Sequence, residues 1–111
     1  MTQDIAIVTG ATGGIGFEIS KELAEQVFFV VGTTYANDPD KTQLWNNALK
    51  DRGSLQQLDI CDEEACQRVV EIAADKGRLA VLINNAGVTD DAFFLKMSIK
   101  QWQSVINTNL T

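Results

Sequence analysis

The sequence contains no histidine, two cysteines, one proline and one tyrosine among its 111 residues. The absence of histidine excludes a catalytic triad with an imidazole base, and two cysteines cannot supply the four ligands of an ordinary zinc site. We therefore expect no metal site. Cys61 and Cys66 are interpreted as structural thiols in a reducing compartment, with Cys66 on the buried face of a helix.

Basic residues and long apolar runs are also scarce. Nine Lys and Arg stand against fifteen Asp and Glu, a formal net charge of -6, and no basic cluster offsets it, which argues against a nucleic-acid partner. No apolar run approaches the roughly 20 residues of a membrane-spanning helix, and no signal peptide is evident. The sequence predicts a soluble, cytoplasmic protein with no membrane partner, comprising one domain or part of one.

Short apolar runs alternate with helical patterns along the chain. The runs at 5–8, 27–31 and 80–83 are unbroken and typical of strands buried on both faces, and 55–58 is a weaker candidate strand. Three sets of apolar residues each share one helix face: Ile15, Ile19, Leu23 and Ala24; Leu44, Trp45, Ala48 and Leu49; and Ala65, Cys66, Val69, Val70 and Ala73. Asp62 is a predicted N-cap, and Gly53 and Gly77 are expected at the ends of the two later helices.

This alternation predicts an α/β fold. Strands separated by helices form a parallel sheet with right-handed crossovers and helices on both faces, as in a Rossmann-type domain. The four strands are expected to be the first half of such a sheet.

A glycine-rich turn, TGATGGIG at residues 9–16, follows the first strand. Such a turn between a strand and a helix brings the backbone close to a phosphate, and the helix N-terminus presents free N–H groups to the anion. The spacing is neither G-x-G-x-x-G nor that of a P-loop, since no Gly-Lys-Ser/Thr follows. The turn favours a nucleotide, although a simple tight turn remains the alternative.

A second motif, NNAG at residues 84–87, follows the fourth strand. In an open parallel sheet, ligands bind beyond the carboxyl ends of the strands where the strand order reverses. That crevice is expected between the first and fourth strands, so both loops would line it. Taken separately, the motif could also be an ordinary turn.

These two motifs, with NTNLT at residues 107–111, resemble the short-chain dehydrogenase/reductases. The resemblance covers the whole chain but only about the first half of the family's usual length, so residues 1–111 would be the N-terminal part of one dinucleotide-binding domain. The sequence looks most like the NADPH-dependent acetoacetyl-CoA reductases, with the 3-oxoacyl-acyl-carrier-protein reductases second. The resemblance implies reduction of a 3-oxoacyl thioester such as acetoacetyl-CoA by the full-length protein, as a homo-oligomer.

The resemblance also implies roles for individual residues. Asn109 would be the catalytic asparagine that supports a proton-relay water, and Asp91 would lie at the substrate entrance, unless it is only a solvated loop acid. The residues expected to contact the cofactor are Gly10, Thr12, Gly14, Ile15 and Gly16 at the turn, Asp59 and Ile60 at the adenine, and Asn85, Ala86, Gly87 and Thr89 after the fourth strand.

The preferred dinucleotide is expected to be NADPH, with NAD less favoured. An NAD enzyme typically has an acid at the end of the second strand to bind the ribose 2′-hydroxyl, and here the sequence reads VGTTY without an acid. The basic residue that many NADPH-using relatives carry in the turn is replaced by Gly13. Lys41 is the nearest cation that could pair with a 2′-phosphate, although it could also be a surface lysine.

The acid-base pair of the family is missing. Its members use a Tyr as acid with a Lys four positions later, in a Tyr-x-x-x-Lys motif. In this sequence the only tyrosine is Tyr35, and the residue four positions later is Pro39. Tyr35 is also expected on the adenosine side of the cofactor. The 111-residue chain alone is therefore expected to be inactive. A non-catalytic NAD(P)-binding module and one piece of a split enzyme remain open as alternatives, although a retained Asn109 favours a reductase.

The predicted strand order 3-2-1-4 leaves the apolar run 80–83 at a sheet edge, where unpaired backbone groups favour association. We expect the isolated 111-residue chain to be marginally stable or self-associating. Thermal unfolding combined with light scattering tests this expectation. A sharp, cooperative transition from a monodisperse monomer would contradict it.

Overall fold

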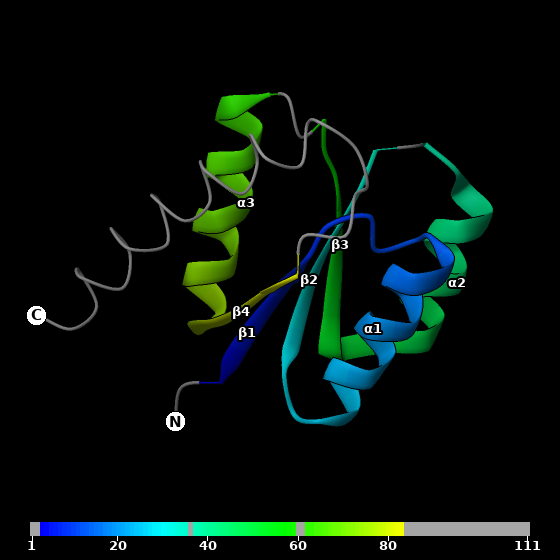
Figure 1. Cartoon of the computed structure of the whole chain (residues 1–111), viewed down its shortest axis with the longest axis horizontal. Helices are drawn as coiled ribbons and strands as arrows, with labels where there is room; N and C mark the ends of the chain where they lie inside the picture. The colour runs from blue at the N-terminus through cyan, green and yellow to red at the C-terminus, as the bar shows by residue number, and fades with distance from the viewer. Residues whose placement is uncertain (1–2, 36, 60–61, 84–111) are drawn as a thin grey trace, which may run out of the picture.

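The computed structural model describes residues 3–35, 37–59 and 62–83, in which strands and α-helices alternate. The strands are β1 (Asp4–Val8), β2 (Phe29–Thr34), β3 (Gly53–Gln57) and β4 (Arg78–Ile83). The helices are α1 (Gly14–Glu25), α2 (Pro39–Leu49) and α3 (Glu63–Lys76), with a 3-10 turn at Lys50–Arg52. All strand pairs are parallel, in the order β3-β2-β1-β4 (Figure 1). The predicted α/β fold is confirmed.

Strand β1 lies at the centre of the molecule. It pairs with β2 on one side and β4 on the other, and its residues Ile5 to Val8 are fully buried. Helix α3 covers one face of the sheet, while α1 and α2 cover the other (Figure 1). A strand buried on both faces needs apolar side chains throughout, which explains the unbroken run.

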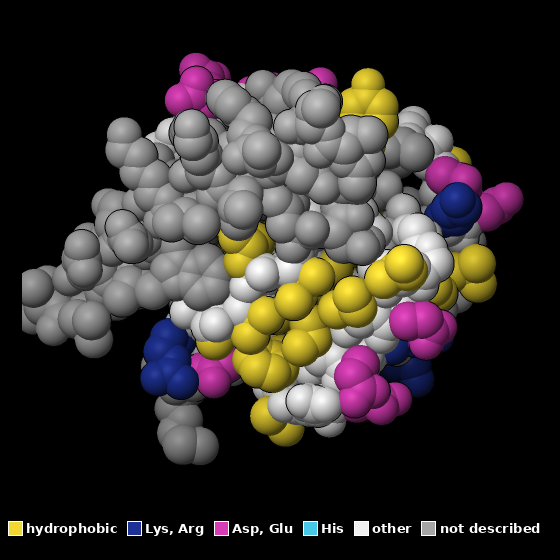
Figure 2. All heavy atoms as spheres, in the orientation of Figure 1, with side chains coloured by type: hydrophobic (Ala, Val, Ile, Leu, Met, Phe, Trp, Pro, Cys, Tyr) yellow, Lys and Arg dark blue, Asp and Glu magenta, His cyan; other side chains and the backbone are white. Residues whose placement is uncertain are grey.

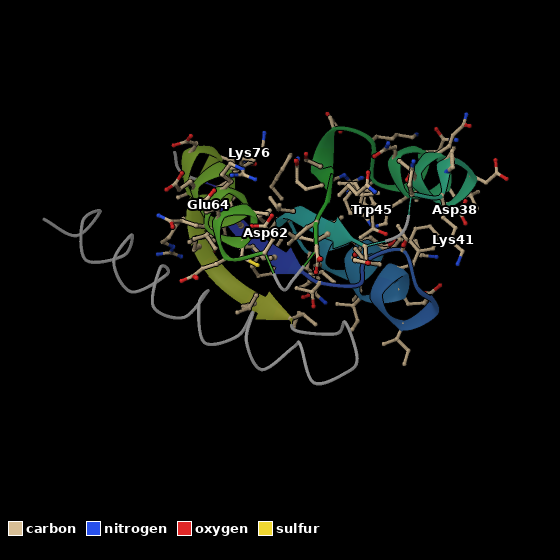
Figure 3. All side chains as sticks on the ribbon, turned by 90° about the horizontal axis from the view of Figure 1, so that it is seen from above. Asp38, Lys41, Trp45, Asp62, Glu64 and Lys76 are labelled. Carbon is tan, nitrogen blue, oxygen red and sulfur yellow. The ribbon has the colours of Figure 1, made fainter. Side chains whose placement is uncertain are left out.

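The side chain of Trp45 packs α2 closely against the sheet. Its fully buried ring approaches the backbone of Gly32 in β2 and Gly53 in β3, where a Cβ atom would lie 2.8 Å from the ring at each position. Figure 3 shows Trp45 between α2 and the strands. Within the described part of the chain, its indole N–H has no hydrogen-bond partner. Both glycines are therefore packing residues that leave room for the indole ring.

The predicted bounds of β2, β3 and β4 differ from the structure, and for β4 the difference is a start at Arg78 and not at residue 80. The run 27–31 was expected to be a strand, but Val27 is 86% exposed with a φ of 72°, and Phe28 N donates to Leu23 O, which closes a turn. Strand β2 instead continues to Thr34 because its pairing with β3 extends that far. Strand β3 is likewise shifted from 55–58 to Gly53–Gln57.

The predicted helix faces are correct for α3 and only partly correct for α1 and α2. Cys66, Val69, Val70 and Ala73 on α3 are buried, as expected, and Ala65 is partly buried. Ile15 is 70% exposed, since α1 packs through the small residues Gly16, Ser20 and Ala24. On α2, Leu44 is 59% exposed and Ala48 is also exposed, because this helix packs through Trp45 and Leu49. An apolar band therefore crosses the face of the molecule where α1 lies (Figure 2). A helix with small residues on its inner face approaches the sheet closely, which an apolar pattern alone does not reveal.

The predicted helix ends are confirmed for α3 and corrected for α2. Asp62 caps α3 by accepting a hydrogen bond from Ala65 N at 3.1 Å, and Gly77 is the C-cap. Gly53 does not end α2, because the helix stops at Leu49 and the 3-10 turn separates the two. None of the helices in residues 3–83 that are described is long and apolar enough to cross a membrane.

We predict that Gly32→Ala destabilises the fold by about 1–3 kcal/mol, because the added methyl group would meet the Ala11 Cβ and the Trp45 ring at 2.8 Å. Chemical denaturation checks the free energy of unfolding. Gly13→Ala is the matched control, since the nearest atom to its Cβ would be Gly10 O at 3.6 Å. Equal stability of the two variants would refute the packing argument.

Candidate functional site

The candidate site lies at the carboxyl edge of the sheet. Because the strands are parallel, the ends of β1, β2 and β3 meet at this edge, together with the turn that follows β1. The chain moves outward from β1 through β2 to β3 and then returns to β4 on the other side of β1. The strand order therefore reverses between β1 and β4, and such a switch point is where open α/β sheets bind ligands.

The glycine turn is held by hydrogen bonds to the strands on both sides of β1. Thr9 N donates to Ile83 O of β4 at 3.0 Å, and Ala11 N donates to Thr33 O of β2 at 2.8 Å. Gly10 has a φ of 61°, a left-handed conformation that favours glycine. The turn is therefore rigidly tied to the sheet, and Gly10 is explained by its backbone conformation.

The N-terminus of α1 differs from those of α2 and α3. Asp38 and Asp62 cap the latter two helices, and both have acids in their first turns. Helix α1 follows Gly13, with no side-chain cap and no acid in its first turn. Its first helical hydrogen bond is from Phe17 N to Gly13 O. Within the described part of the chain, the three preceding N–H groups and the positive end of the helix dipole are therefore suited to an anion.

The glycines of this helix start have different environments. A Cβ atom at Gly14 would have no atom within 4 Å among the described residues, and its φ is not left-handed. Neither packing nor backbone conformation within this part of the chain therefore requires a glycine at Gly14. Gly16 is buried on the sheet side of α1. The exposed Ile15 lies between them, at the open end of the helix.

Thr12, predicted to bind the cofactor, has a protein partner at the end of β2. Its Oγ1 lies 2.9 Å from the Oγ1 of Thr34, and either hydroxyl can donate. Thr34 was not predicted as a site residue. The signal that could have revealed it is a hydroxyl at the strand end where an NAD enzyme would place an acid.

The second-strand end and the start of α2 carry little positive charge. Lys41 is exposed in the first turn of α2, where its backbone N–H donates to Asp38 Oδ1 at 3.2 Å. Asp40 lies in the same turn. Figure 3 shows Lys41 beside Asp38 at this end of α2. Tyr35 follows β2 directly and is exposed, so its predicted position just after the second strand is confirmed.

Asp59 follows β3 at the same edge. Its carbonyl accepts from Asp62 N at 2.9 Å, and the preceding Leu58 N donates to Thr34 O. The other predicted site residues lie outside the described part of the chain: Ile60, Asn85, Ala86, Gly87, Thr89, Asp91 and Asn109. Gly10, Thr12, Gly14 and Asp59 all follow strands at the carboxyl edge of the sheet. The described residues hold no cluster of metal-binding side chains.

A parallel sheet covered on both faces, with a glycine turn after its first strand, defines a Rossmann-type α/β protein. Residues 4–111 match the family model of the short chain dehydrogenases. The chain belongs to this family.

Curated relatives agree with this assignment. The chain is 39% identical to an acetoacetyl-CoA reductase of Acinetobacter sp. over 97% of its own length and 45% of the relative's. It is 37% identical to a 3-oxoacyl-acyl-carrier-protein reductase of Haemophilus influenzae, over 100% of this chain and 46% of the relative. The chain thus spans less than half the length of these relatives, as the sequence resemblance implied.

Solved structures show the same fold. A double mutant of a Serratia marcescens short-chain dehydrogenase/reductase superposes with a TM-score of 0.79 at 25% identity, covering 91% of this chain and 50% of that one. A blue fluorescent protein from a metagenomic library, in complex with NADPH, gives a TM-score of 0.78 at 24% identity, with coverage of 91% and 50%. The latter likeness concerns the fold alone.

Proposed function

We propose that this chain forms the cofactor-holding part of a reductase that uses NADPH to convert a 3-oxoacyl thioester, acetoacetyl-CoA, to the 3-hydroxyacyl thioester. The observation that carries the proposal is the N-terminus of α1, which lacks a cap and an acid and borders open space at Gly14. Both features suit a pyrophosphate. Membership of the short chain dehydrogenase family supports a nicotinamide dinucleotide as its source.

The proposed preference for NADPH rests on charge at the end of β2. Thr33 and Thr34 are neutral and buried where an acid would repel a 2′-phosphate. Lys41 is the proposed cationic partner, although Asp38 and Asp40 beside it weaken the local positive potential. The preference is thus proposed to arise mainly from the absence of a repelling acid.

In this proposal the bound cofactor supplies a hydride to the 3-oxo carbon. Gly10, Gly14 and Thr12 hold its phosphates and adjoining ribose, and Asp59 with Ile60 meets the adenine. Asn85, Ala86, Gly87 and Thr89 flank its central part. The family resemblance supports a role for Asn109 with a proton-relay water and a role for Asp91 in admitting the substrate. The acid of the reaction has to come from residues outside this sequence, since no Tyr-x-x-x-Lys occurs in it.

A 3-oxoacyl-acyl-carrier-protein substrate is the second candidate. It is favoured by the 37% identity to the Haemophilus influenzae enzyme, which is close to the 39% identity to the acetoacetyl-CoA reductase. Both substrates carry the same 3-oxoacyl thioester group, so the same hydride chemistry serves either one. Comparing kcat/KM for acetoacetyl-CoA and acetoacetyl-acyl-carrier-protein in the full-length protein distinguishes them.

We predict that Gly14→Ala weakens NADPH binding at least tenfold without lowering stability. The new methyl group meets no described atom, and Ala in place of Gly favours a helix by up to about 1 kcal/mol, but the methyl group fills the space assigned to the cofactor. Titration of NADPH fluorescence and thermal unfolding measure the two effects. Gly13→Ala is the control and should retain binding. Unchanged affinity in Gly14→Ala would contradict the proposed cradle.

A gain-of-function variant tests the dinucleotide preference. Gly13 has an extended backbone with room for a side chain, so Gly13→Arg adds a cation to the turn without strain. We expect NADPH to bind about fivefold more tightly and NADH to be unaffected, with the gain lost at high salt. Gly13→Gln supplies a neutral control of similar length. An equal change for both dinucleotides would contradict the placement of the 2′-phosphate beside the turn.

A further inference from the structure

The hydroxyl pair of Thr12 and Thr34 links the glycine turn to the end of β2. The two Oγ1 atoms are 2.9 Å apart, across 22 residues of sequence. Thr34 is only 7% exposed, whereas Thr12 is partly exposed at the turn. The pair therefore has a buried member fixed in the sheet and an outer member beside the uncapped start of α1.

Backbone hydrogen bonds hold the two segments that carry the pair. Thr33 O accepts from Ala11 N at 2.8 Å, which places the residue before Thr12 against β2. Thr34 O accepts from Leu58 N at 2.9 Å, which ties Thr34 to the end of β3. These bonds hold the two backbone segments close together, and the hydrogen bond between the side chains can run in either direction.

The direction decides what Thr12 offers to a ligand. A hydroxyl group has one hydrogen to donate and two lone pairs. If Thr12 donates to Thr34, only lone pairs of Thr12 remain, and these repel an anionic oxygen. If Thr34 donates to Thr12, the Thr12 hydrogen remains for an oxygen of the ligand. An anion at the positive end of α1 favours the second direction, and hydrogen bonds in such a chain strengthen each other.

We propose that Thr34 is a positioning residue of the nucleotide site: its hydroxyl donates to Thr12 Oγ1 and so directs the Thr12 O–H to an oxygen of the bound nucleotide. This inference rests on the proposed nucleotide-binding function and adds a residue of β2 to it. Thr34 acts through Thr12 and needs no contact with the ligand.

Thr34→Val in the full-length protein tests the inference, because valine keeps the shape of threonine and removes the hydroxyl. With NADPH as the probe, we expect about tenfold weaker binding. Thr34→Ser keeps the donor and should retain the affinity of the parent chain within about twofold. Thr34→Cys, a weaker donor, should fall between them and serves as a second variant if Thr34→Val does not fold.

A double-mutant cycle separates the relay from two independent contacts. Thr12→Val should weaken NADPH binding as much as Thr34→Val does, and the double variant should lose no more than either single variant. Additive losses, or normal affinity in Thr34→Val beside a loss in Thr12→Val, would overturn the relay. Lower thermal stability of Thr34→Val with unchanged affinity would also overturn it, since this describes a purely structural residue.

Failure of the proposed function has a different signature. If the parent chain and Thr34→Ser both bind no NADPH while remaining folded, the nucleotide site itself is refuted and the role of Thr34 with it. If the parent chain binds NADPH and Thr34→Val binds it equally well, only the role of Thr34 is refuted.

Discussion

The burial of β1 between β2 and β4 is the constraint on which the remaining structure depends. Ile5 to Val8 have no exposed surface, so helices cover both faces of the sheet and a strand lies on each side of β1. The chain therefore places β2 on one side of β1 and returns later to place β4 on the other side. That return creates the switch point in the strand order. The glycine turn begins where β1 ends, so its position at the switch point follows from the burial of the strand before it.

The N-termini of helices α1, α2 and α3 differ in how they are capped. Asp38 accepts a hydrogen bond from Lys41 N and Asp62 accepts one from Ala65 N, so α2 and α3 are each capped by a side chain of the protein itself. The start of α1 follows Gly13, and among the described residues it has no side-chain cap and no acid in its first turn. Capping thus distinguishes helices that only support the sheet from the helix proposed to bind an anion.

The fold could be predicted from the sequence because its central strand and helix α3 have characteristic patterns of apolar residues. The β-branched run of β1 and the apolar face of α3, which includes Cys66, are patterns that only buried elements need, and both predictions are confirmed. The pattern failed where an apolar residue is exposed for local reasons. Val27 has a left-handed backbone in a turn, and Ile15 lies on the outer side of α1, so apolar character alone misplaced both residues.

The candidate site could be predicted only in part, because its main cross-link depends on strand register. Val8, the last residue of β1, pairs with Gly32, so β2 extends two residues beyond β1, and the turn folds back onto this extension. Thr33 and Thr34 are the residues that hold the turn there. A strand predicted to end at residue 31 has no such extension. Locating the partner of Thr12 therefore required the register of the parallel pair, which arises from packing across the sheet and leaves no local pattern in the sequence.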